Sequence, residues 1–378
     1  MRTQKSLLSL AVLVALSGSA LADNSTVNAI QNGSSNAITS TQIGANQSSV
    51  YAEQNGRRNT AGIEQTATSS SVSAVQAGSN NTATAQQNGN SNQTGIKQVG
   101  NGGQTAAVKQ GSANNTASVE QTWNTNSTVQ IDQGHTYGGN NNQAYATQNG
   151  NNGTTSNTIQ WAGSNNLASS NQQVNNAAQS TISQRDGNNN KGWVTQVGNN
   201  VATATIAQSR GDSNEGSINQ QYAIYNNAAG IDQSYGSANK AAIGQNGGWN
   251  NTATVTQANG NQNQGYVTQT AVAESSAAVK QTQGSNNTAN VNQSYGWKLV
   301  ANVEQKGNNN QANTVQTGAY NEARLLQDGY NNVANVNQSG IGLVGQSNVV
   351  ALTQANSNNV ANVTQTGGAG NTATITQR

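Results

Sequence analysis

The feature that most constrains this chain is an internal repeat of 11 to 13 residues, each copy of which contains one glutamine at a fixed position. These glutamines run from Gln31 to Gln377 and mark 30 copies. Two intervals are longer, at 15 and 16 residues, and contain residues 135–138 and 339–345, which we interpret as loop insertions. A short, sustained period is typical of solenoids, in which each repeat packs against its neighbours.

Within each copy, residues two apart share their chemical character. Counting back from the glutamine, position −2 is Val, Ile or Leu in 21 copies, and position −6 is Asn in 20 copies and Ser in five. Position −4 is small or β-branched, and none of these positions is charged, whereas position −1 carries charges such as Glu53, Lys97 and Glu304. Alternate residues of a strand point to one face. We therefore predict one β-strand per copy, with Asn, Ala, Val and Gln facing inward.

Turn-forming strings separate the predicted strands. Gln245 to Asn250 and Gln283 to Asn287 are rich in Gly and Asn, which tolerate the left-handed backbone of tight turns. Proline, which would interrupt a hydrogen-bonded ladder, is absent from the chain. The pattern predicts an all-β fold over 23–378: a two-sheet β-solenoid, or β-helix, of about 15 coils with two strands per coil. At about 4.8 Å per coil, such a cross-β stack would be about 70 Å long.

The predicted interior is unusually polar, since the chain contains 65 Asn and 45 Gln. A buried carboxamide without partners costs a few kcal/mol, but stacked copies can donate to one neighbour and accept from the other. We therefore expect carboxamide ladders along the solenoid. The predicted ladder glutamines are Gln65, Gln121, Gln196, Gln245, Gln257, Gln269, Gln293, Gln338, Gln365 and Gln377. The predicted ladder asparagines are Asn59, Asn115, Asn251, Asn287, Asn332, Asn359 and Asn371.

Residues 1–22 have the features of a secretory signal peptide. Arg2 and Lys5 precede an apolar run, and Ala20-Leu21-Ala22 forms a cleavage motif that ends before Asp23. Cleavage would remove two of the 15 basic residues and leave 13 against 13 acidic residues. A neutral mature chain argues against nucleic-acid binding and offers little repulsion to self-association. The absence of Cys excludes disulfides and thiolate metal sites.

The repeat resembles that of the curlin family, which has the form Ser-x5-Gln-x-Gly-x-x-Asn-x-Ala-x3-Gln. The second half is complete from Gln54 to Gln65, and the match covers nearly all of 25–377. Copies of Ser-x5-Gln begin at Ser25, Ser48, Ser70, Ser127 and Ser275.

The resemblance implies a secreted subunit of curli, the functional amyloid fibres that give bacterial biofilms their matrix, surface adhesion and cell aggregation. We also expect a homopolymer on the bacterial cell surface, and we consider host matrix proteins as further partners. The resemblance also implies export through an outer-membrane channel with accessory chaperones, and nucleation by a minor curlin subunit. Here the repeats begin at Ser25 without a Gly-rich leader segment, and Ile375 to Arg378 is similar to the ending of minor curlins. A nucleating subunit therefore stays an alternative.

Two readings from other functional classes are weaker. An enzyme is not expected, because the acidic residues are scattered and His135 is the sole imidazole; we also expect no cofactor or metal. Outward threonines, as at 252, 254 and 256, do not recur regularly enough for an ice-binding face. A monomeric repeat adhesin is the main rival, because Arg210-Gly211-Asp212 matches an integrin-recognition tripeptide in a predicted turn. We expect end-to-end polymerisation.

Overall fold

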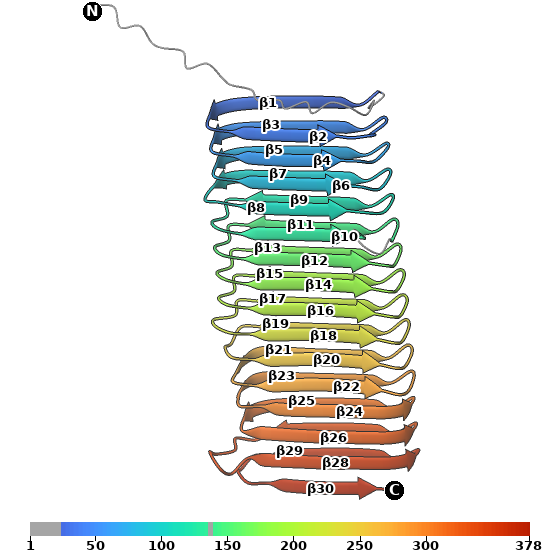
Figure 1. Cartoon of the computed structure of the whole chain (residues 1–378). Coiled ribbons are helices and arrows are strands. Elements are labelled where there is room, and N and C mark those ends of the chain that lie inside the picture. The colour runs from blue at the N-terminus through green and yellow to red at the C-terminus, as the bar shows by residue number, and fades with distance from the viewer. Residues whose placement is uncertain (1–23, 135–138) are drawn as a thin grey trace, which may run out of the picture.

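The computed structural model describes residues 24–134 and 139–378. The predicted signal segment 1–22, its cleavage site between Ala22 and Asp23, and His135 lie outside these residues. The described residues form two parallel β-sheets of 15 strands each, stacked as a β-solenoid (Figure 1). The predicted two-sheet β-solenoid is confirmed.

Consecutive strands alternate between the two sheets, and each strand corresponds to one copy of the repeat. The first sheet contains β1 (Thr26–Ser34), β3 (Ser49–Arg57), β5 (Ser71–Ser79), β7 (Gln93–Asn101), β9 (Thr116–Thr122), β11 (Gln143–Asn149), β13 (Leu167–Gln173), β15 (Lys191–Val197), β17 (Glu215–Gln221), β19 (Lys240–Asn246), β21 (Gln264–Ala273), β23 (Thr288–Trp297), β25 (Gln311–Ala319), β27 (Val333–Ser339) and β29 (Val360–Thr366). The second sheet contains β2 (Ala37–Gln42), β4 (Thr60–Gln65), β6 (Thr82–Gln87), β8 (Thr105–Gln110), β10 (Thr128–Gln133), β12 (Thr155–Trp161), β14 (Gln179–Arg185), β16 (Thr203–Ser209), β18 (Ala228–Ser234), β20 (Thr252–Ala258), β22 (Ser276–Thr282), β24 (Val300–Asn308), β26 (Asn321–Tyr330), β28 (Asn348–Ser357) and β30 (Thr372–Gln377).

Each strand pairs in parallel with the strand one coil away, and equivalent repeat positions lie side by side. Gln31 pairs with Gln54, and Gln54 pairs with Gln76. A slip by one residue would turn every inward side chain outward, so the two-residue alternation fixes this register. The register therefore stacks equivalent repeat positions, and in particular the glutamines, along the described coils.

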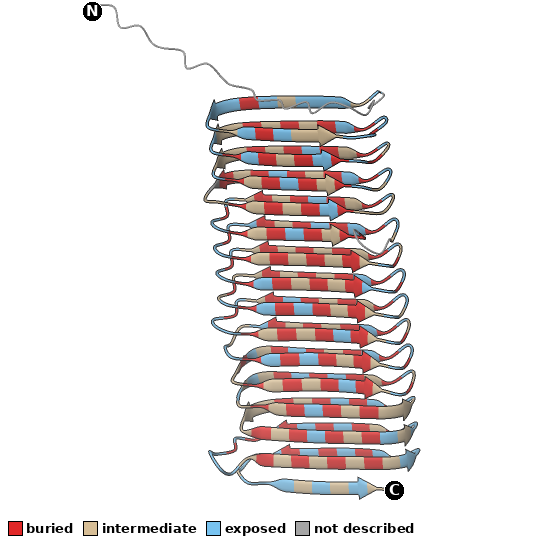
Figure 2. Cartoon of the chain, viewed as in Figure 1, coloured by how far each residue is buried: buried red, intermediate tan, exposed pale blue. Residues whose placement is uncertain are grey.

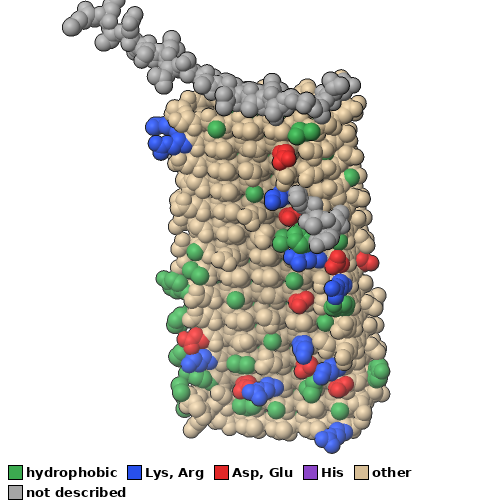
Figure 3. All heavy atoms as spheres, in the orientation of Figure 1, with side chains coloured by type: hydrophobic (Ala, Val, Ile, Leu, Met, Phe, Trp, Pro, Cys, Tyr) green, Lys and Arg blue, Asp and Glu red, His purple; other side chains and the backbone are tan. Residues whose placement is uncertain are grey.

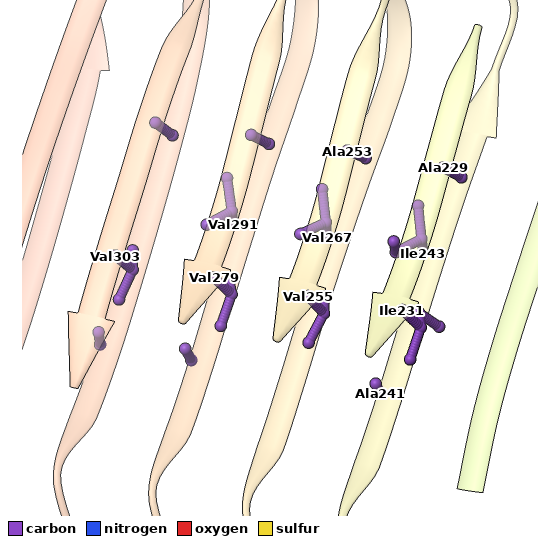
Figure 4. Close-up of a cluster of buried hydrophobic side chains, with 14 of the residues drawn as sticks. Ala229, Ile231, Ala241, Ile243, Ala253, Val255, Val267, Val279, Val291 and Val303 are labelled. Atoms are coloured by element: carbon purple, nitrogen blue, oxygen red, sulfur yellow. The ribbon is translucent and has the colours of Figure 1, made fainter. Parts of the chain in front are cut away.

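Burial alternates along nearly every strand, as the red and pale bands of Figure 2 show. Residues at −4 and −2 pack between the sheets, with Ile231 and Val255 on one sheet facing Ile243 and Val267 on the other (Figure 4). Burying a Val or Ile side chain stabilises the fold by about 1.5–3 kcal/mol. This narrow, repeated apolar strip is the hydrophobic core.

The apolar core is interrupted once. One cluster of buried apolar residues ends at Ala146 and the other begins at Ala168. At this interruption several core positions are polar: Ser156 and Thr158 on β12, Ser170 on β13 and Ser180 on β14. The hydroxyl of Ser170 donates to that of Ser180 at 2.9 Å, whereas Ser156 Oγ and Thr158 Oγ1 have no hydrogen-bond partner. This polar layer divides the solenoid into two apolar blocks.

Glycines stack at the turns from the second sheet to the first. A Cβ added at Gly187 would lie 2.1 Å from the carbonyl oxygen of Gly211, and one at Gly211 would lie 2.0 Å from that of Gly236. A side chain at these positions cannot fit without moving the backbone of the next coil. Of the two predicted loop insertions, 339–345 lies between β27 and β28, with Leu343 bridged to Gln346. The other falls on residues outside the description.

Candidate functional site: glutamine ladders and end coils

One glutamine per strand builds two unbroken hydrogen-bonded ladders. In each step the Nε2 of one glutamine donates to the Oε1 of the glutamine in the next coil, at 2.7–2.9 Å. The first-sheet ladder joins Gln31, Gln54, Gln76, Gln98, Gln121, Gln148, Gln172, Gln196, Gln220, Gln245, Gln269, Gln293, Gln316, Gln338 and Gln365. The second-sheet ladder joins Gln42, Gln65, Gln87, Gln110, Gln133, Gln160, Gln184, Gln208, Gln233, Gln257, Gln281, Gln305, Gln327, Gln354 and Gln377.

The second amide hydrogen of a ladder glutamine goes to a backbone carbonyl of the facing sheet. Gln257 donates to the carbonyl of Lys240 at 2.9 Å, and Gln196 donates to that of Gln179 at 3.1 Å. A flipped amide would set Oε1 against these carbonyl oxygens. From Gln54 and Gln65 onward, the backbone therefore holds the ladder amides in one orientation, and both ladders have the same polarity.

The ten predicted ladder glutamines all belong to these two ladders. Gln65, Gln257 and Gln377 lie on the second sheet, and the others lie on the first. Gln365 and Gln377 occupy the last coil, where Gln377 is half-buried because no further coil covers it.

The asparagines differ from the prediction. The Oδ1 of Asn263 accepts the backbone N–H of Asn287 at 3.0 Å, and the Nδ2 of Asn263 donates to the carbonyl of Gly284 at 2.8 Å. Asn is one methylene shorter than Gln and precedes the strand, so it reaches the turn backbone of the next coil. Most predicted Asn ladder residues bind backbone groups and no neighbouring side-chain amide; these are Asn59, Asn115, Asn251, Asn332 and Asn359.

Two of the predicted asparagines also contact the side-chain amide of the preceding coil. Asn287 Nδ2 donates to Asn263 Oδ1 at 3.2 Å, and Asn371 Nδ2 donates to Asn348 Oδ1 at 3.1 Å. Both also donate to turn carbonyls, so their main role matches that of the other asparagines. The carboxamide ladder prediction is therefore wrong for the Asn positions as a group.

A second set of buried asparagines was not predicted. Asn151 donates its backbone N–H to Asn124 Oδ1 and its Nδ2 to the carbonyl of Gln172, both at 2.8 Å. Asn175 and Asn199 repeat this pattern in the next two coils. These asparagines bind the turn backbone in coils where position −6 on the second sheet is Ser, Thr or Ala instead of Asn, as at Ala178. The signal for them is an Asn three residues after the glutamine in successive coils.

Charges lie on the outside and pair between adjacent coils. The Nζ of Lys97 lies 2.8 Å from Oε1 of Glu120, and the Nζ of Lys280 lies 3.3 Å from Oε1 of Glu304. Desolvation raises the pKa of Glu304, but hydrogen bonds and charge from Lys280 and Lys306 outweigh it and hold this pKa below its ordinary value. Such exposed pairs contribute about 0–1 kcal/mol each. Among the described residues, no Asp, Glu, Lys, Arg or His side chain is buried in the interior of the solenoid, where the ladders lie.

The two end coils leave opposite halves of the ladders open. Within the described residues, no side chain donates to the Oε1 of Gln31 or Gln42. At the other end, Gln365 and Gln377 donate to the preceding backbone but have no following amide. Strands β29 and β30 have only one neighbour each in their sheets, and neither they nor β1 and β2 contain a charged residue. Among the described residues, the solenoid thus has unpaired amide acceptors in its first coil and unpaired amide donors in its last.

The Arg210-Gly211-Asp212 tripeptide has a structural explanation. Gly211 belongs to the stacked glycines, and the Arg210 guanidinium lies 5.0 Å from the ring centroid of Tyr235. Asp212 Oδ1 accepts the backbone N–H of Asn188 at 2.6 Å. One coil further, the hydroxyl of Ser237 accepts the N–H of Asp212 in the same way. Asp212 therefore fills a turn position that Ser and Asn fill in neighbouring coils.

The part of the chain that the structure describes was compared with the requirements of a metal site and of a membrane-spanning helix. There, no three His, Cys, Asp or Glu residues come together in a group that could hold a metal ion. The same residues include no helix with the length and apolar character needed to cross a membrane. No protein-family model matches the chain, and no curated protein is significantly similar to it. The curlin resemblance therefore depends on the repeat motif itself.

Proposed function

We propose that this chain is a structural subunit that polymerises end to end into a fibre. The observation that carries the proposal is the complementarity of the two open ends: donors leave the last coil and acceptors begin the first. An open sheet edge is a template for another chain. The glutamine ladders and the parallel strand pairing that join successive coils would then continue across the junction between molecules.

The side chains of the two ends match when this stacking is continued. Placing Gln31 on Gln365 sets Asn28 on Asn362, and Asn362 already accepts from Asn335 at 2.8 Å within the chain. On the second sheet, placing Gln42 on Gln377 sets Thr39 on Thr374 and Thr41 on Thr376. Identical polar side chains therefore meet, and no charge is buried.

The polarity of the ladders favours one arrangement of the fibre. Head-to-tail stacking pairs amide donors with acceptors, whereas joining two first coils would place Oε1 against Oε1. A head-to-tail contact produces a closed ring when the rotation between subunits closes, and an open filament when it does not. Stacking along the solenoid axis does not close, so it produces an open filament. The partner is accordingly another copy of this chain.

The sequence features extend the proposal to location and partners. The signal segment supports secretion, and the repeat motif supports a curli-like extracellular fibre on a bacterial surface. In that setting the partners would include an outer-membrane secretion channel, accessory chaperones and a nucleating minor subunit. The fibre would serve the biofilm matrix, surface adhesion and cell aggregation.

A seeding experiment tests the proposal. The purified mature chain at neutral pH should convert from a soluble form to fibrils after a lag, and preformed fibrils should shorten that lag. Ile375→Lys, which places a charge on the inward face of the last coil, should block elongation. Thr374→Lys, on the outward face of the same strand, is the matched control and should elongate. A wild-type chain that stays monomeric for days at micromolar concentration would contradict the proposal.

A further inference from the structure

Exposed large hydrophobic residues gather on one edge of the solenoid, formed by the turns from first-sheet to second-sheet strands. Figure 3 shows such side chains along the lower left, beside the C-terminal half. We call this the hydrophobic edge, and its members are Trp123, Val174, Val201, Tyr222, Ile224, Tyr225, Trp249, Tyr295, Trp297, Ile341, Leu343 and Val344. On the opposite edge, the described exposed residues of this kind are Ile43, Tyr235, Tyr330 and Val360. A contiguous exposed apolar surface marks an interaction site more often than scattered residues do.

One column of this edge has a regular order of large and small side chains. Successive coils pair Tyr225 with Trp249, Trp249 with Ala273, Ala273 with Trp297, Trp297 with Ala319, and Ala319 with Ile341. The preceding residue Val272 is buried, whereas both tryptophans are 43% exposed. From Trp249 onward, each large side chain therefore alternates with a gap at an alanine.

We propose that this edge binds the same edge of a second copy of the chain, with the two solenoids antiparallel. A two-fold axis between the coils of Ala273 and Trp297 sets Trp297 opposite the partner's Ala273. It also sets Trp249 opposite the partner's Ala319, and Tyr225 opposite the partner's Ile341. Both tryptophans then face an alanine, and the contact is self-complementary, as an interface with two-fold symmetry must be.

The charges of this edge agree with a second copy as the occupant. From residue 221 onward, the turns that form this edge contain only one acidic and one basic side chain, Glu274 and Lys298. The Nζ of Lys298 lies 3.6 Å from Oε2 of Glu274. The Lys298 ammonium also lies 5.0 Å from the ring centroid of Trp297. The same two-fold axis sets the coil of Glu274 opposite the partner's coil of Lys298. Two identical edges therefore meet without net repulsion.

The inference depends on the proposed function, because a fibre repeats the edge once in every subunit. A single edge-to-edge contact is small, but two fibres joined through many copies gain strength by multivalency. We therefore expect fibres to associate sideways into bundles.

The test compares fibre assembly with fibre bundling. The double variant Trp249→Ser, Trp297→Ser should form fibrils at the wild-type rate, measured by dye binding and sedimentation. It should lack the bundles that we expect for wild type in electron micrographs. The matched control removes two aromatics from the opposite edge, Tyr235→Ser with Tyr330→Ser, and should still bundle. Ala273→Trp fills the gap while adding apolar area, and should also give single fibres.

Four results would overturn the proposal. The first is that wild-type fibres stay single, and the second is that the tryptophan variant bundles like wild type. The third is that Ala273→Trp bundles more strongly than wild type. The fourth is that wild-type fibres stay single but bind an insoluble polysaccharide through the tryptophans, which would make the edge a carbohydrate-binding surface. If wild type forms no fibrils, the proposed function fails separately. The soluble chains are then compared by analytical ultracentrifugation, where a dimer lost in the tryptophan variant supports the pairing and a wild-type monomer contradicts it.

Discussion

Replacing Gln257 by glutamate changes one ladder position while keeping its shape. Gln257 accepts from Gln233 and donates to Gln281, both at 2.8 Å, and donates to the carbonyl of Lys240 at 2.9 Å. A carboxylate keeps the first bond, but it turns both donations into contacts between acceptors and buries a charge. Breaking a buried, paired arrangement in this way costs about 3–5 kcal/mol. Gln257→Met, which leaves the partners unpaired without a charge, should cost about 1–3 kcal/mol.

Hydrogen exchange read by mass spectrometry measures this loss where it occurs. Stability in a solenoid is set by each coil and its neighbours, so protection should fall most in β18, β20 and β22. Thr256→Glu, one residue away on the outer face, is the matched control and should change stability by less than about 0.5 kcal/mol. Because burial raises the pKa of a carboxyl, the Gln257→Glu defect should ease as the pH falls. Equal losses in Gln257→Glu and Thr256→Glu would refute the assignment of the inward face.

Three further changes probe other parts of the fold. Thr158→Val removes a buried hydroxyl without a partner from the polar layer, and should raise the denaturation midpoint by the equivalent of about 1 kcal/mol; a lower midpoint would mean that the hydroxyl is satisfied. Gly187→Ala should lower the melting temperature because the new Cβ meets the next coil, while Gly244→Ala, which has open space around it, should not; similar effects would argue against the stacked glycines. The pKa of Glu304 is lowered in the folded chain, so its ion pairs stabilise the fold above the unfolded-state pKa, and this stability is lost as the pH falls through the folded-state pKa. Acidification to about pH 3 should therefore lower the free energy of unfolding by less than about 1 kcal/mol at this site. The far-UV circular dichroism signal of the sheets should stay intact. Loss of the sheets at that pH would show that titratable groups support the interior.

The strands and their faces could be predicted from the sequence because the two-residue alternation is sustained over the whole chain. The glutamines occupy the end of each strand, and an in-register parallel stack leaves their amides no other equivalent partner. The roles of the asparagines could not be predicted, because position −6 lies where strand and turn meet. Whether its amide reaches a side chain or the backbone depends on the path of the turn.

Features that depend on neighbouring coils were the hardest to anticipate. Asn124 and Asn151 lie at a different offset from the glutamine than Asn115 does, and they line up only because the coils there contain longer turns. Thr158 and Ser170 each replace a single apolar residue in the repeat, and only the two-sheet arrangement brings them into one layer. Trp249 and Trp297 likewise share a column only once the coils are in register.

A cryo-EM map of the assembled fibre tests the central claim most directly. It should show side-chain density for Gln31 of one molecule stacked on Gln365 of the preceding molecule, at the same spacing of about 4.8 Å that separates coils within the chain. A water-filled gap at the junction, or a junction that joins two equivalent ends, would contradict the account.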